Sequence, residues 1–444
     1  MLNSSLLQRF NVHWSTGKIS EDLAKPFRRS VYFDVLNRLE YRQVVVITGL
    51  RRVGKSTTMF QLIQELLLRG VAPRNILYFS FDDEKNTVEE VLETYERDVL
   101  TKNFGALEER IYVFLDEVQY SKGWEGKLKT FYDLYPKIKF VVSGSASLLV
   151  EKSVRERLAG RFFTVAVFPL DFREFSAMKK VQLGHVEFNF ARLKEAYLKQ
   201  TVALPLFSEF VRKGGFPELT FESNEVIVAE YIRNSVVDRV VFKDFALLAD
   251  KRDFELFEKI INLTCANPGM LTNYINVSND LKRDRRTISN YFRLLAYAML
   301  LFQTSNYRKG AISIRKLPKT YLASTGIIFS LYPQNFTEKE TLSRIIENLV
   351  VISCRAKYYW RRGKNEVDIV LERNQKLVPV EIKFRKEIAN KDVKGLLKFI
   401  NENNLDFGII ISEATINEIT LDKTTIWIIP AWLFLLVDKR SISD

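Results

Sequence analysis

Cysteine and histidine are scarce in this sequence of 444 residues, which contains two of each. Cys265 and Cys354 lie far apart along the chain, so a disulfide framework is excluded and a reducing compartment fits the composition. His13 and His185 are also far apart. This spacing argues against a zinc site built from Cys and His. With only two histidines, catalysis by a Ser-His or Cys-His pair is also not expected.

Long apolar segments are lacking as well. The longest apolar run, residues 426–437, contains Pro430 and is shorter than the roughly 20 residues that a membrane-spanning helix needs. We expect this run to form a buried strand and a turn. The N-terminal residues show no apolar core of signal-peptide length, so we expect a soluble protein of the cytoplasm.

The overall composition is that of a globular protein with a surplus of positive charge. Hydrophobic residues make up 47% of the chain and charged residues 27%, which excludes a disordered chain. The length predicts about two to four domains. Lys and Arg number 67 against 54 Asp and Glu, a formal net charge of +13. A surplus of this sign favours polyanionic partners, either nucleic acid or an acidic surface.

The first half of the sequence alternates strand and helix patterns. Residues 44–48 are a continuous β-branched, apolar run, which is typical of a buried parallel strand. Four more strand-like runs follow, at residues 76–81, 111–115, 138–142 and 165–168. Strands separated by helices indicate βαβ units, so we predict an α/β fold with a doubly wound parallel sheet over roughly residues 20–175.

A phosphate-binding motif follows the first strand. Residues 49–56, GLRRVGKS, match G-x-x-x-x-G-K-[ST] and precede a helical pattern. Backbone N–H groups of such a loop bind phosphates, Lys55 would reach the β- and γ-phosphates of ATP, and Ser56 would bind Mg²⁺. The residues that we predict to hold ATP and its Mg²⁺ are Gly49, Arg51, Arg52, Val53, Gly54, Lys55, Ser56, Thr57 and Asp116.

Two acidic residues end the strand at 111–115. We expect Asp116 to emerge near the Mg²⁺ bound by Ser56, and Glu117 to polarise the attacking water. Asp82 and Asp83 form a second acidic pair after the preceding strand. A place in the same cleft and a solvated turn are equally good interpretations of that pair.

Two later segments are also open to two interpretations. A polar residue in residues 142–147, VSGSAS, could sense the γ-phosphate, or these small residues could form a plain strand exit. Arg161 could act as an arginine finger on the phosphates of a neighbouring subunit, or it could be a surface arginine. Action in trans would require a homo-oligomer, for which a hexameric ring is one arrangement.

The middle of the chain carries most of the surplus charge. Ten Lys or Arg and one acidic residue lie between Lys282 and Lys319. Helices over residues 271–281 and 285–298, a turn over 282–284 and a wing over 302–314 would make a winged helix-turn-helix. We expect this segment to bind DNA through basic and polar side chains. The candidates are Lys282, Arg283, Arg285, Arg286, Thr287 and Asn290. The alternatives are a solvated charged surface and a protein-interaction module.

The C-terminal segment carries carboxylates in a nuclease-like order. Asp368 lies in one predicted strand, and Glu381 and Lys383 lie two apart in the next, so they share a face. Glu347, in a predicted helix over residues 342–352, is a candidate fourth member. Such carboxylates hold Mg²⁺ or Mn²⁺, and a lysine there stabilises negative charge. The layout resembles the PD-(D/E)xK nucleases; an inherited fold kept for binding, without cleavage, is the alternative.

Taken in order, several motifs resemble one family. GLRRVGKST, LDEVQ, VVSGSASLL, LAGR, FPLDFREF and KGGFPE resemble AAA-type ATPases of archaea and bacteria that carry a C-terminal nuclease-like domain of unknown function. The similarity covers about residues 25–438. It implies an additional-strand P-loop fold with Glu117 as the hydrolytic residue. Residues 319–326 depart from the family, in which an Asp usually stands near Ser324, so we assign this turn no role.

These observations lead to one domain prediction and three functional readings. We predict a P-loop core over residues 20–175, a helical extension over 176–250, a winged helix over 251–330 and a nuclease-like domain over 331–444. The first reading is a Mg²⁺-dependent ATPase that acts on DNA. The second is a slow, STAND-like regulatory ATPase whose winged helix binds protein. The third, a nuclease with a vestigial ATPase, conflicts with the intact phosphate-binding motif.

Overall fold

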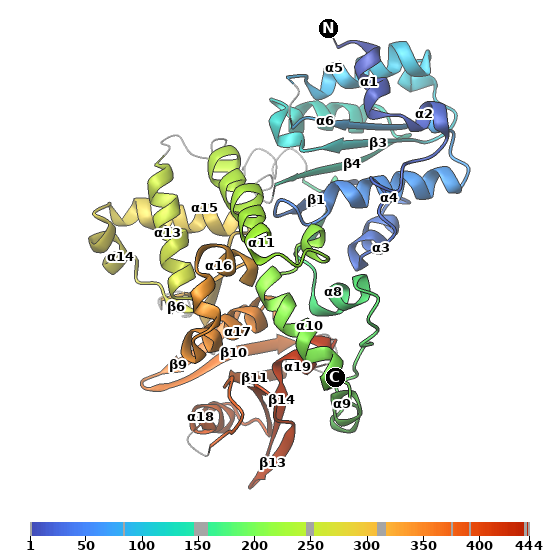
Figure 1. The fold of residues 1–444 in the computed structure, drawn as a ribbon. Coiled ribbons are helices and arrows are strands. Elements are labelled where there is room, and N and C mark those ends of the chain that lie inside the picture. Colours follow the sequence, from blue (N-terminus) through green and yellow to red (C-terminus); the bar gives the residue numbers. More distant parts are fainter. Residues whose placement is uncertain are drawn as a thin grey trace. The chain divides into compact units, whose positions relative to one another are not determined.

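The computed structural model describes residues 2–82, 85–145, 159–245, 253–308, 317–373, 376–389, 392–438 and 442 (Figure 1). The chain divides into two compact units, Met1–Phe168 and Pro169–Asp444. Within the described ranges, every helix is too short or too polar to cross a membrane.

The N-terminal unit is built on a parallel β-sheet. Its strands are β1 (Val44–Gly49), β2 (Ile76–Ser80), β3 (Ile111–Asp116), β4 (Ile138–Ser145) and β5 (Phe162–Val167). They lie in the order β2-β3-β4-β1-β5, and each neighbouring pair is parallel. The α/β class and the parallel sheet that the sequence predicts are therefore confirmed. Because β4 lies between β1 and β3, its carboxyl end lies between the P-loop and Asp116.

Helices cover both faces of this sheet. In the part of the unit that is described they are α1 (Ser4–Phe10), α2 (His13–Thr16), α3 (Ser30–Leu36), α4 (Lys55–Leu68), η1 (Pro73–Asn75), α5 (Val88–Thr94), η2 (Tyr95–Leu100), η3 (Phe104–Ala106), η4 (Val118–Tyr120) and α6 (Trp124–Leu134). Helices α1, α5 and α6 lie on one face, and α3 and α4 on the other (Figure 1). Leu7, Leu92 and Leu128 join Val44 and Val113 in one apolar core.

The C-terminal unit opens with helices. They are α8 (Phe172–Met178), α9 (Phe190–Tyr197), α10 (Gln200–Lys213), η6 (Pro217–Leu219), α11 (Glu225–Ile232), η7 (Arg233–Val237) and η8 (Val240–Asp244). Helix α10 ends at Gly214, whose φ of +67° favours glycine. A Cβ atom on Gly214 would collide with Ser324 and Gly326, so the turn after α10 packs tightly against the start of α16 (Thr325–Leu331).

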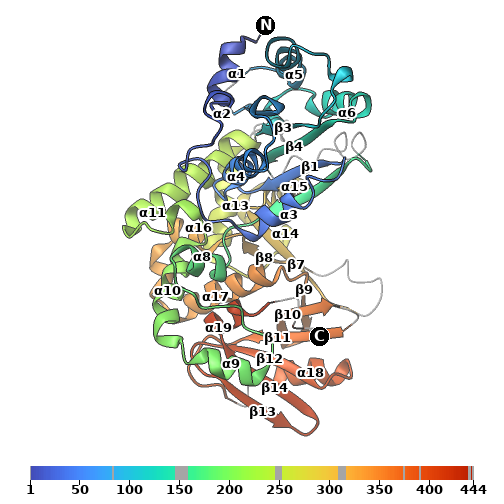
Figure 2. The same cartoon turned by 90° about the vertical axis from the view of Figure 1, so that its right-hand side faces the viewer.

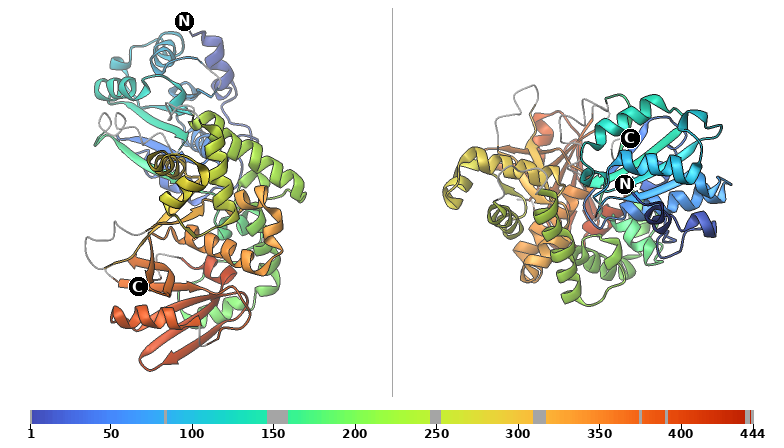
Figure 3. Two further views of the ribbon diagram at one scale, coloured as in Figure 1. Left: turned by 90° about the vertical axis from the view of Figure 1, so that its left-hand side faces the viewer. Right: turned by 90° about the horizontal axis from the view of Figure 1, so that it is seen from above.

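A small helical group with three strands follows. It consists of α13 (Phe254–Ala266), β6 (Met270–Leu271), α14 (Tyr274–Leu281), α15 (Arg285–Tyr297), β7 (Leu301–Asn306), β8 (Lys319–Leu322) and α16 (Thr325–Leu331). Figure 3 shows α13–α15 in yellow as one group. We expected a helix to begin at residue 271, but Met270 and Leu271 pair with β8 instead. Asn273 then caps α14 by accepting hydrogen bonds from two backbone N–H groups.

The last part of the chain continues the same sheet. It comprises η10 (Pro333–Phe336), α17 (Lys339–Cys354), β9 (Tyr358–Arg362), β10 (Asn365–Arg373), β11 (Lys376–Ile382), α18 (Lys394–Glu402), β12 (Phe407–Ser412), β13 (Asn417–Leu421), β14 (Thr424–Pro430) and α19 (Ala431–Leu436). Among the described residues, the sheet order is β13-β14-β12-β11-β10-β9-β7-β8-β6. Helix α18 packs on one face of its C-terminal half, and α17 and α19 pack on the other (Figure 2).

One C-terminal element differs from the sequence prediction. We expected a strand and a turn in residues 426–437, but α19 follows β14 directly. Pro430 stands at its N-cap, a position that tolerates the missing N–H of proline. All six residues of α19 are buried. A helix that is apolar all round belongs in a core, which is why this segment shows no amphipathic pattern in the sequence.

Candidate functional site

The P-loop connects β1 to α4 with two glycines that the geometry requires. A Cβ atom on Gly49 would collide with the carbonyl group of Val167, so β5 can approach this closely only because residue 49 is glycine. Gly54 has a φ of +93°, a left-handed conformation that other residues rarely adopt. Helix α4 begins at the next residue, so its first N–H groups face the loop.

Lys55 folds back along this loop. Its Nζ atom donates to the carbonyl oxygens of Gly49 and Leu50, at 3.3 and 3.0 Å. The same atom lies 3.7 Å from Oε1 of Glu117, and the lysine side chain is only 4% exposed. A buried ammonium group with these neighbours supplies a fixed positive charge at the centre of the loop.

Asp116 is the centre of a hydrogen-bond network at the carboxyl end of the sheet. Its Oδ2 accepts from the hydroxyl groups of Ser56, at 2.5 Å, and Tyr78, at 2.9 Å. Its Oδ1 accepts from the hydroxyl group of Ser143. Burial and the neighbouring Glu117 raise the pKa of Asp116. The hydroxyl oxygen of Ser56 and the carboxylate of Asp116 are the hard ligands that Mg²⁺ prefers, so this pair fits the expected ion.

Glu117 is held in a left-handed backbone conformation, with a φ of +52°. Its N–H group lies 3.2 Å from Oδ1 of Asp116 and 3.3 Å from Oγ of Ser143. Its Oε2 accepts from Nε2 of Gln119 at 2.5 Å. Hydrogen bonds therefore hold both the backbone N–H group and the carboxylate of Glu117, beside Lys55 and Asp116.

The other residues predicted at this site lie around the loop. Arg51 is largely buried, and its guanidinium group donates to the hydroxyl group of Tyr120. The carbonyl oxygen of Val53 accepts from Nη1 of Arg29 at 2.8 Å. Arg52 is exposed and Thr57 half-buried.

The remaining acidic and polar candidates follow β2 and β4, and only some of them lie in the described residues. Asp82 follows β2, with its backbone N–H group 3.5 Å from Oγ of Ser80. Asp83, Ala146 and Ser147 lie outside the described residues. Among the described polar residues expected after the fourth strand, Ser143 reaches the network around Asp116.

Arg161 lies at the other end of the sheet. It directly precedes β5, whose first residue, Phe162, pairs with Val44 at the amino end of β1. The P-loop follows the carboxyl end of β1, so the structure does not bring Arg161 to Lys55 of the same chain. The guanidinium group pairs with Asp133 of α6 instead, with Nε 2.9 Å from Oδ1.

The basic residues before and within α15 are mostly exposed. Asp284 caps α15 by accepting from the N–H groups of Arg286 and Thr287. Arg283 pairs with Asp253 at 3.0 Å, and Oδ1 of Asn290 accepts from Arg293 at 2.6 Å. Exposed side chains at this end of the helix belong to Lys282, Arg283, Arg285 and Arg286.

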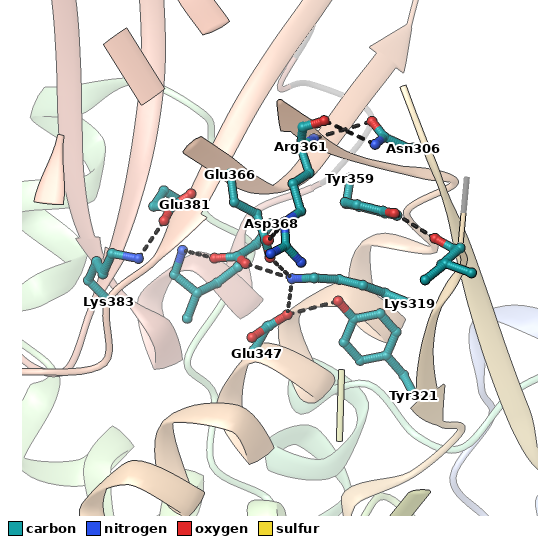
Figure 4. A network of polar contacts seen from close by, with 12 residues as sticks. Asn306, Lys319, Tyr321, Glu347, Tyr359, Arg361, Glu366, Asp368, Glu381 and Lys383 are labelled. Carbon is teal, nitrogen blue, oxygen red and sulfur yellow. Dashed lines mark hydrogen bonds and ion pairs between the residues drawn. The ribbon is translucent and has the colours of Figure 1, made fainter. Parts of the chain in front are cut away.

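Lys319, which we counted with this basic segment, lies elsewhere. It is buried in a cluster of carboxylates (Figure 4). Its Nζ lies 3.0 Å from Oε1 of Glu347, 2.5 Å from Oε1 of Glu366 and 3.0 Å from Oδ1 of Asp368. Burial alone would lower the pKa of Lys319, but Glu347 and Asp368 raise it well above its usual value. Lys319 therefore contributes no charge to the surface of the protein.

The nuclease-like residues do converge, but around this lysine. Glu347 reaches the cluster from α17, Asp368 from β10 and Glu381 from β11. Lys383 donates to Oε1 of Glu381, while Oε2 of Glu381 is one of the few buried side-chain oxygens in the described residues that have no hydrogen-bond partner. Burial raises the pKa of Glu381 well above its usual value.

The described residues form no group of three or more Asp, Glu, His or Cys side chains able to hold a metal ion. With Lys319 between Glu347 and Asp368, the cluster does not fit a second metal ion as it stands. Burial and the neighbouring Asp368 raise the pKa of Glu347 to about 7.

Sequence reasoning missed several members of these two sites. Tyr78 and Lys319 are polar side chains at buried positions of two short strands, ILYFS and KTYL. A polar residue at a buried strand position requires a partner, and that requirement is the signal that could have found them. Tyr321, two residues after Lys319 and therefore on the same face of β8, donates to Oε1 of Glu347 at 2.8 Å.

Comparison with known protein families identifies the domain that contains the P-loop. Residues 41–176 match the model of an AAA domain. The match and the geometry agree on an AAA-type P-loop domain. Residues 204–339 and 344–434 match two domains of unknown function, DUF8612 and DUF4143. The AAA domain thus contains the whole P-loop, Asp116 and Glu117, and the carboxylate cluster draws its residues from both other matches.

Two uncharacterized proteins are similar to this chain over most of its length. An uncharacterized protein of Haemophilus influenzae is 25% identical over 354 residues, covering 77% of this chain and 82% of the relative. One from Methanocaldococcus jannaschii is 26% identical over 429 residues, covering 91% and 90%.

Two solved structures overlap with the chain at lower similarity. They are a Walker-type ATPase of Pyrococcus abyssi (17% identity, TM-score 0.40, 69% of this chain and 95% of that one) and AMPPCP-bound DnaA from Aquifex aeolicus (16%, 0.27, 65% and 92%). Both TM-scores lie below 0.5, so the fold is assigned from the strand order and the AAA match alone.

Proposed function

We propose that this chain is a Mg²⁺-dependent ATPase that binds DNA through its C-terminal unit. The ATPase part rests on one observation. Side chains from the ends of β1 and β3 meet in a single connected network of Lys55, Ser56, Asp116 and Glu117. This is the set of charges that phosphoryl transfer to water needs: a cation for the phosphates, ligands for a metal ion and a base for water.

Each residue has a separate task in this proposal. The ammonium group of Lys55 and the N–H groups at the start of α4 bind the phosphates. Ser56 and Asp116 would hold Mg²⁺, which neutralises phosphate charge when it is bound with the nucleotide. Glu117 orients the attacking water and accepts its proton, while Gln119 and the backbone of Glu117 keep the carboxylate in place.

The DNA-binding part rests on the arrangement around α15. Three helices, α13–α15, together with the strand order β7-β8-β6, support a winged helix. Exposed Arg285 and Arg286 occupy the first turn of α15, next to exposed Lys282. Basic side chains at the start of such a helix suit contacts with the phosphates of DNA. We do not include DNA cleavage, because the carboxylate cluster does not fit a metal ion as it stands.

ATP turnover of a Glu117→Gln variant tests the first part. We expect turnover to fall by about 10²–10⁴-fold, the usual contribution of a general base, while ATP still binds. Glu93→Gln removes an exposed carboxylate from α5 of the same unit and should leave turnover unchanged. Wild-type turnover in Glu117→Gln would remove Glu117 from the mechanism.

The second part requires turnover measurements with and without duplex, single-stranded and branched DNA, at two salt concentrations. We expect stimulation that weakens steeply as salt rises. Slow turnover with ATP-dependent assembly and no DNA effect at either salt concentration would instead identify a regulatory ATPase whose winged helix binds protein.

A further inference from the structure

The carboxylate cluster of the C-terminal unit already contains a cation. Lys319 enters it from β8, between Glu347 of α17 and Asp368 of β10 (Figure 4). The ammonium group lies within 3.0 Å of three carboxylates, the third being Glu366, and the lysine side chain is only 5% exposed. A position equidistant from Glu347 and Asp368 is where a bridging metal ion would have to bind.

Three oxygens of Asp368 and Glu347 that a bridging metal ion could use are already engaged. Oδ1 of Asp368 accepts from Lys319, and Oδ2 accepts from the backbone N–H group of Ile382 at 2.9 Å. Oε1 of Glu347 accepts from both Lys319 and Tyr321. A divalent ion bridging Asp368 and Glu347 would therefore have to displace the ammonium group of Lys319, which three carboxylates hold in place.

The charges lead to the same conclusion. Within the described part of the cluster, the carboxylates Glu347, Glu366, Asp368 and Glu381 meet the cations Lys319, Lys383 and Arg361. The negative charge is thus nearly balanced by the chain itself. A divalent ion added beside Lys319 would face an ammonium group at short range, where the effective dielectric constant is low and repulsion is strong.

We propose that Lys319 is the resident cation of this cluster and that the cluster binds no divalent metal ion while Lys319 is in place. This inference does not depend on ATP hydrolysis or on DNA binding, since it concerns only side chains within the C-terminal unit.

The inference predicts that removing the ammonium group creates a metal site. In a Lys319→Met variant, Asp368 and Glu347 lose their shared cation, and the unpartnered Oε2 of Glu381 supplies a third oxygen. We would titrate the full-length protein with Mn²⁺ alone, without nucleotide, and follow the bound ion by electron paramagnetic resonance. We expect Lys319→Met to gain a site at least about tenfold tighter than any wild-type site that depends on Asp368.

Three further variants isolate the cause. The added change Asp368→Asn should abolish the new Mn²⁺ site, and Lys319→Arg, which keeps the charge, should not create it. Lys213→Met is the matched control, because Lys213 is an equally buried lysine that pairs with the carboxylate of Glu209 in the same unit. It should gain no Mn²⁺ site.

Two results would overturn the inference. One is a folded Lys319→Met variant that binds no more Mn²⁺ than the wild type. The other needs only the Asp368→Asn change: if wild-type protein binds Mn²⁺ and Asp368→Asn loses that binding, Lys319 does not exclude the ion. This second comparison decides the question even if Lys319→Met fails to fold.

Discussion

Hydroxyl groups position both acidic residues of the nucleotide site. Ser143, which is completely buried at the carboxyl end of β4, donates to Asp116 and lies 3.3 Å from the backbone nitrogen of Glu117. It is the one side chain in the described network that contacts both acidic residues. We therefore expect Ser143 to position Asp116 and Glu117 rather than to react.

A Ser143→Ala variant tests this role. Asp116 and Glu117 would each lose a hydrogen-bond partner, so we expect kcat to fall by about 10–100-fold, which corresponds to roughly 1.4–2.7 kcal/mol of barrier. The apparent affinity for ATP should change much less, because Lys55 and the P-loop remain intact. Ser176→Ala removes an equally buried hydroxyl from the C-terminal unit and serves as control. An unchanged kcat in Ser143→Ala would contradict the positioning role.

The sequence predicts only those site residues that a local pattern carries. Lys55 and Ser56 belong to one contiguous motif, and Asp116 and Glu117 end one apolar run. Ser143 could not be chosen from the sequence, because its contact with Asp116 exists only if β4 lies next to β3. Lys319 was wrongly counted with the basic segment for the same reason, because the charge of a side chain does not show which neighbouring strands and helices it contacts.

At the scale of elements, helix α2 anchors the N-terminal segment to the edge strand β2. Nε2 of His13 and Nε1 of Trp14 both lie within hydrogen-bond distance of the carbonyl oxygen of Ile76, at 3.0 and 2.7 Å. A carbonyl group only accepts, so Nε2 carries the proton. Nδ1 of His13 is buried and has no hydrogen-bond partner among the described residues.

This anchor should weaken in acid. Burial lowers the pKa of His13 in spite of the hydrogen bond to Ile76, so the unfolded segment binds a proton at a higher pH than the folded one. Stability then falls as the pH drops through the ordinary histidine range near 6.5, by at most about 1.4 kcal/mol per pH unit. Hydrogen exchange of β2 at pH 7.5 and 5.5, corrected for intrinsic rates, measures this loss.

The histidine variants separate this effect from general acid titration. His13→Gln should lose most of the extra pH dependence of β2, whereas His185→Gln, which changes a largely exposed ring, should keep it. Equal pH dependence in the wild type and His13→Gln would show that another group is responsible.

Element prediction succeeded where the pattern was strong. Four of the five parallel strands of the N-terminal unit carry a buried apolar run, and β5 buries Val165 and Val167. β13 was missed because its sequence, NEITL, is largely polar and exposed at the edge of the sheet. β9, YYWRR, was missed because its buried aromatic pair is followed by two exposed arginines and so shows no apolar run. These strands are defined by pairing with β10 and β14 rather than by their own residues.

At the scale of the whole chain, the proposed function couples two units. A double variant Arg285→Ala and Arg286→Ala removes two exposed charges from the start of α15. We expect weaker DNA binding and a salt dependence, d log K/d log [salt], that is less steep by about 2. DNA-stimulated ATP turnover should fall in parallel.

A matched variant controls for the loss of charge. Lys394→Ala with Lys398→Ala removes two exposed lysines from α18 of the same unit. It should retain DNA binding and stimulated turnover. If both double variants lose binding equally, the effect comes from net charge and α15 has no particular role.

The position of Arg161 makes the assembly of the protein into an oligomer testable. Arg161 lies at the amino end of the sheet, opposite the P-loop of its own chain, and pairs with Asp133 at the surface. An arginine placed there can stabilise the phosphates of ATP only in a neighbouring subunit. Arg161→Ala should then reduce turnover by on the order of 10³-fold, as expected for a lost arginine finger. Asp133→Asn, which removes only the partner, should keep its activity.

Mixing two inactive variants decides whether the arginine acts in trans. Glu117→Gln disables the hydrolytic residue but keeps Arg161, and Arg161→Ala does the reverse. In a mixed oligomer, some interfaces combine an intact Glu117 on one subunit with an intact Arg161 on the next, so turnover should reappear. No recovery in oligomers shown to exchange subunits would mean that both residues act within one chain or that Arg161 is a surface residue.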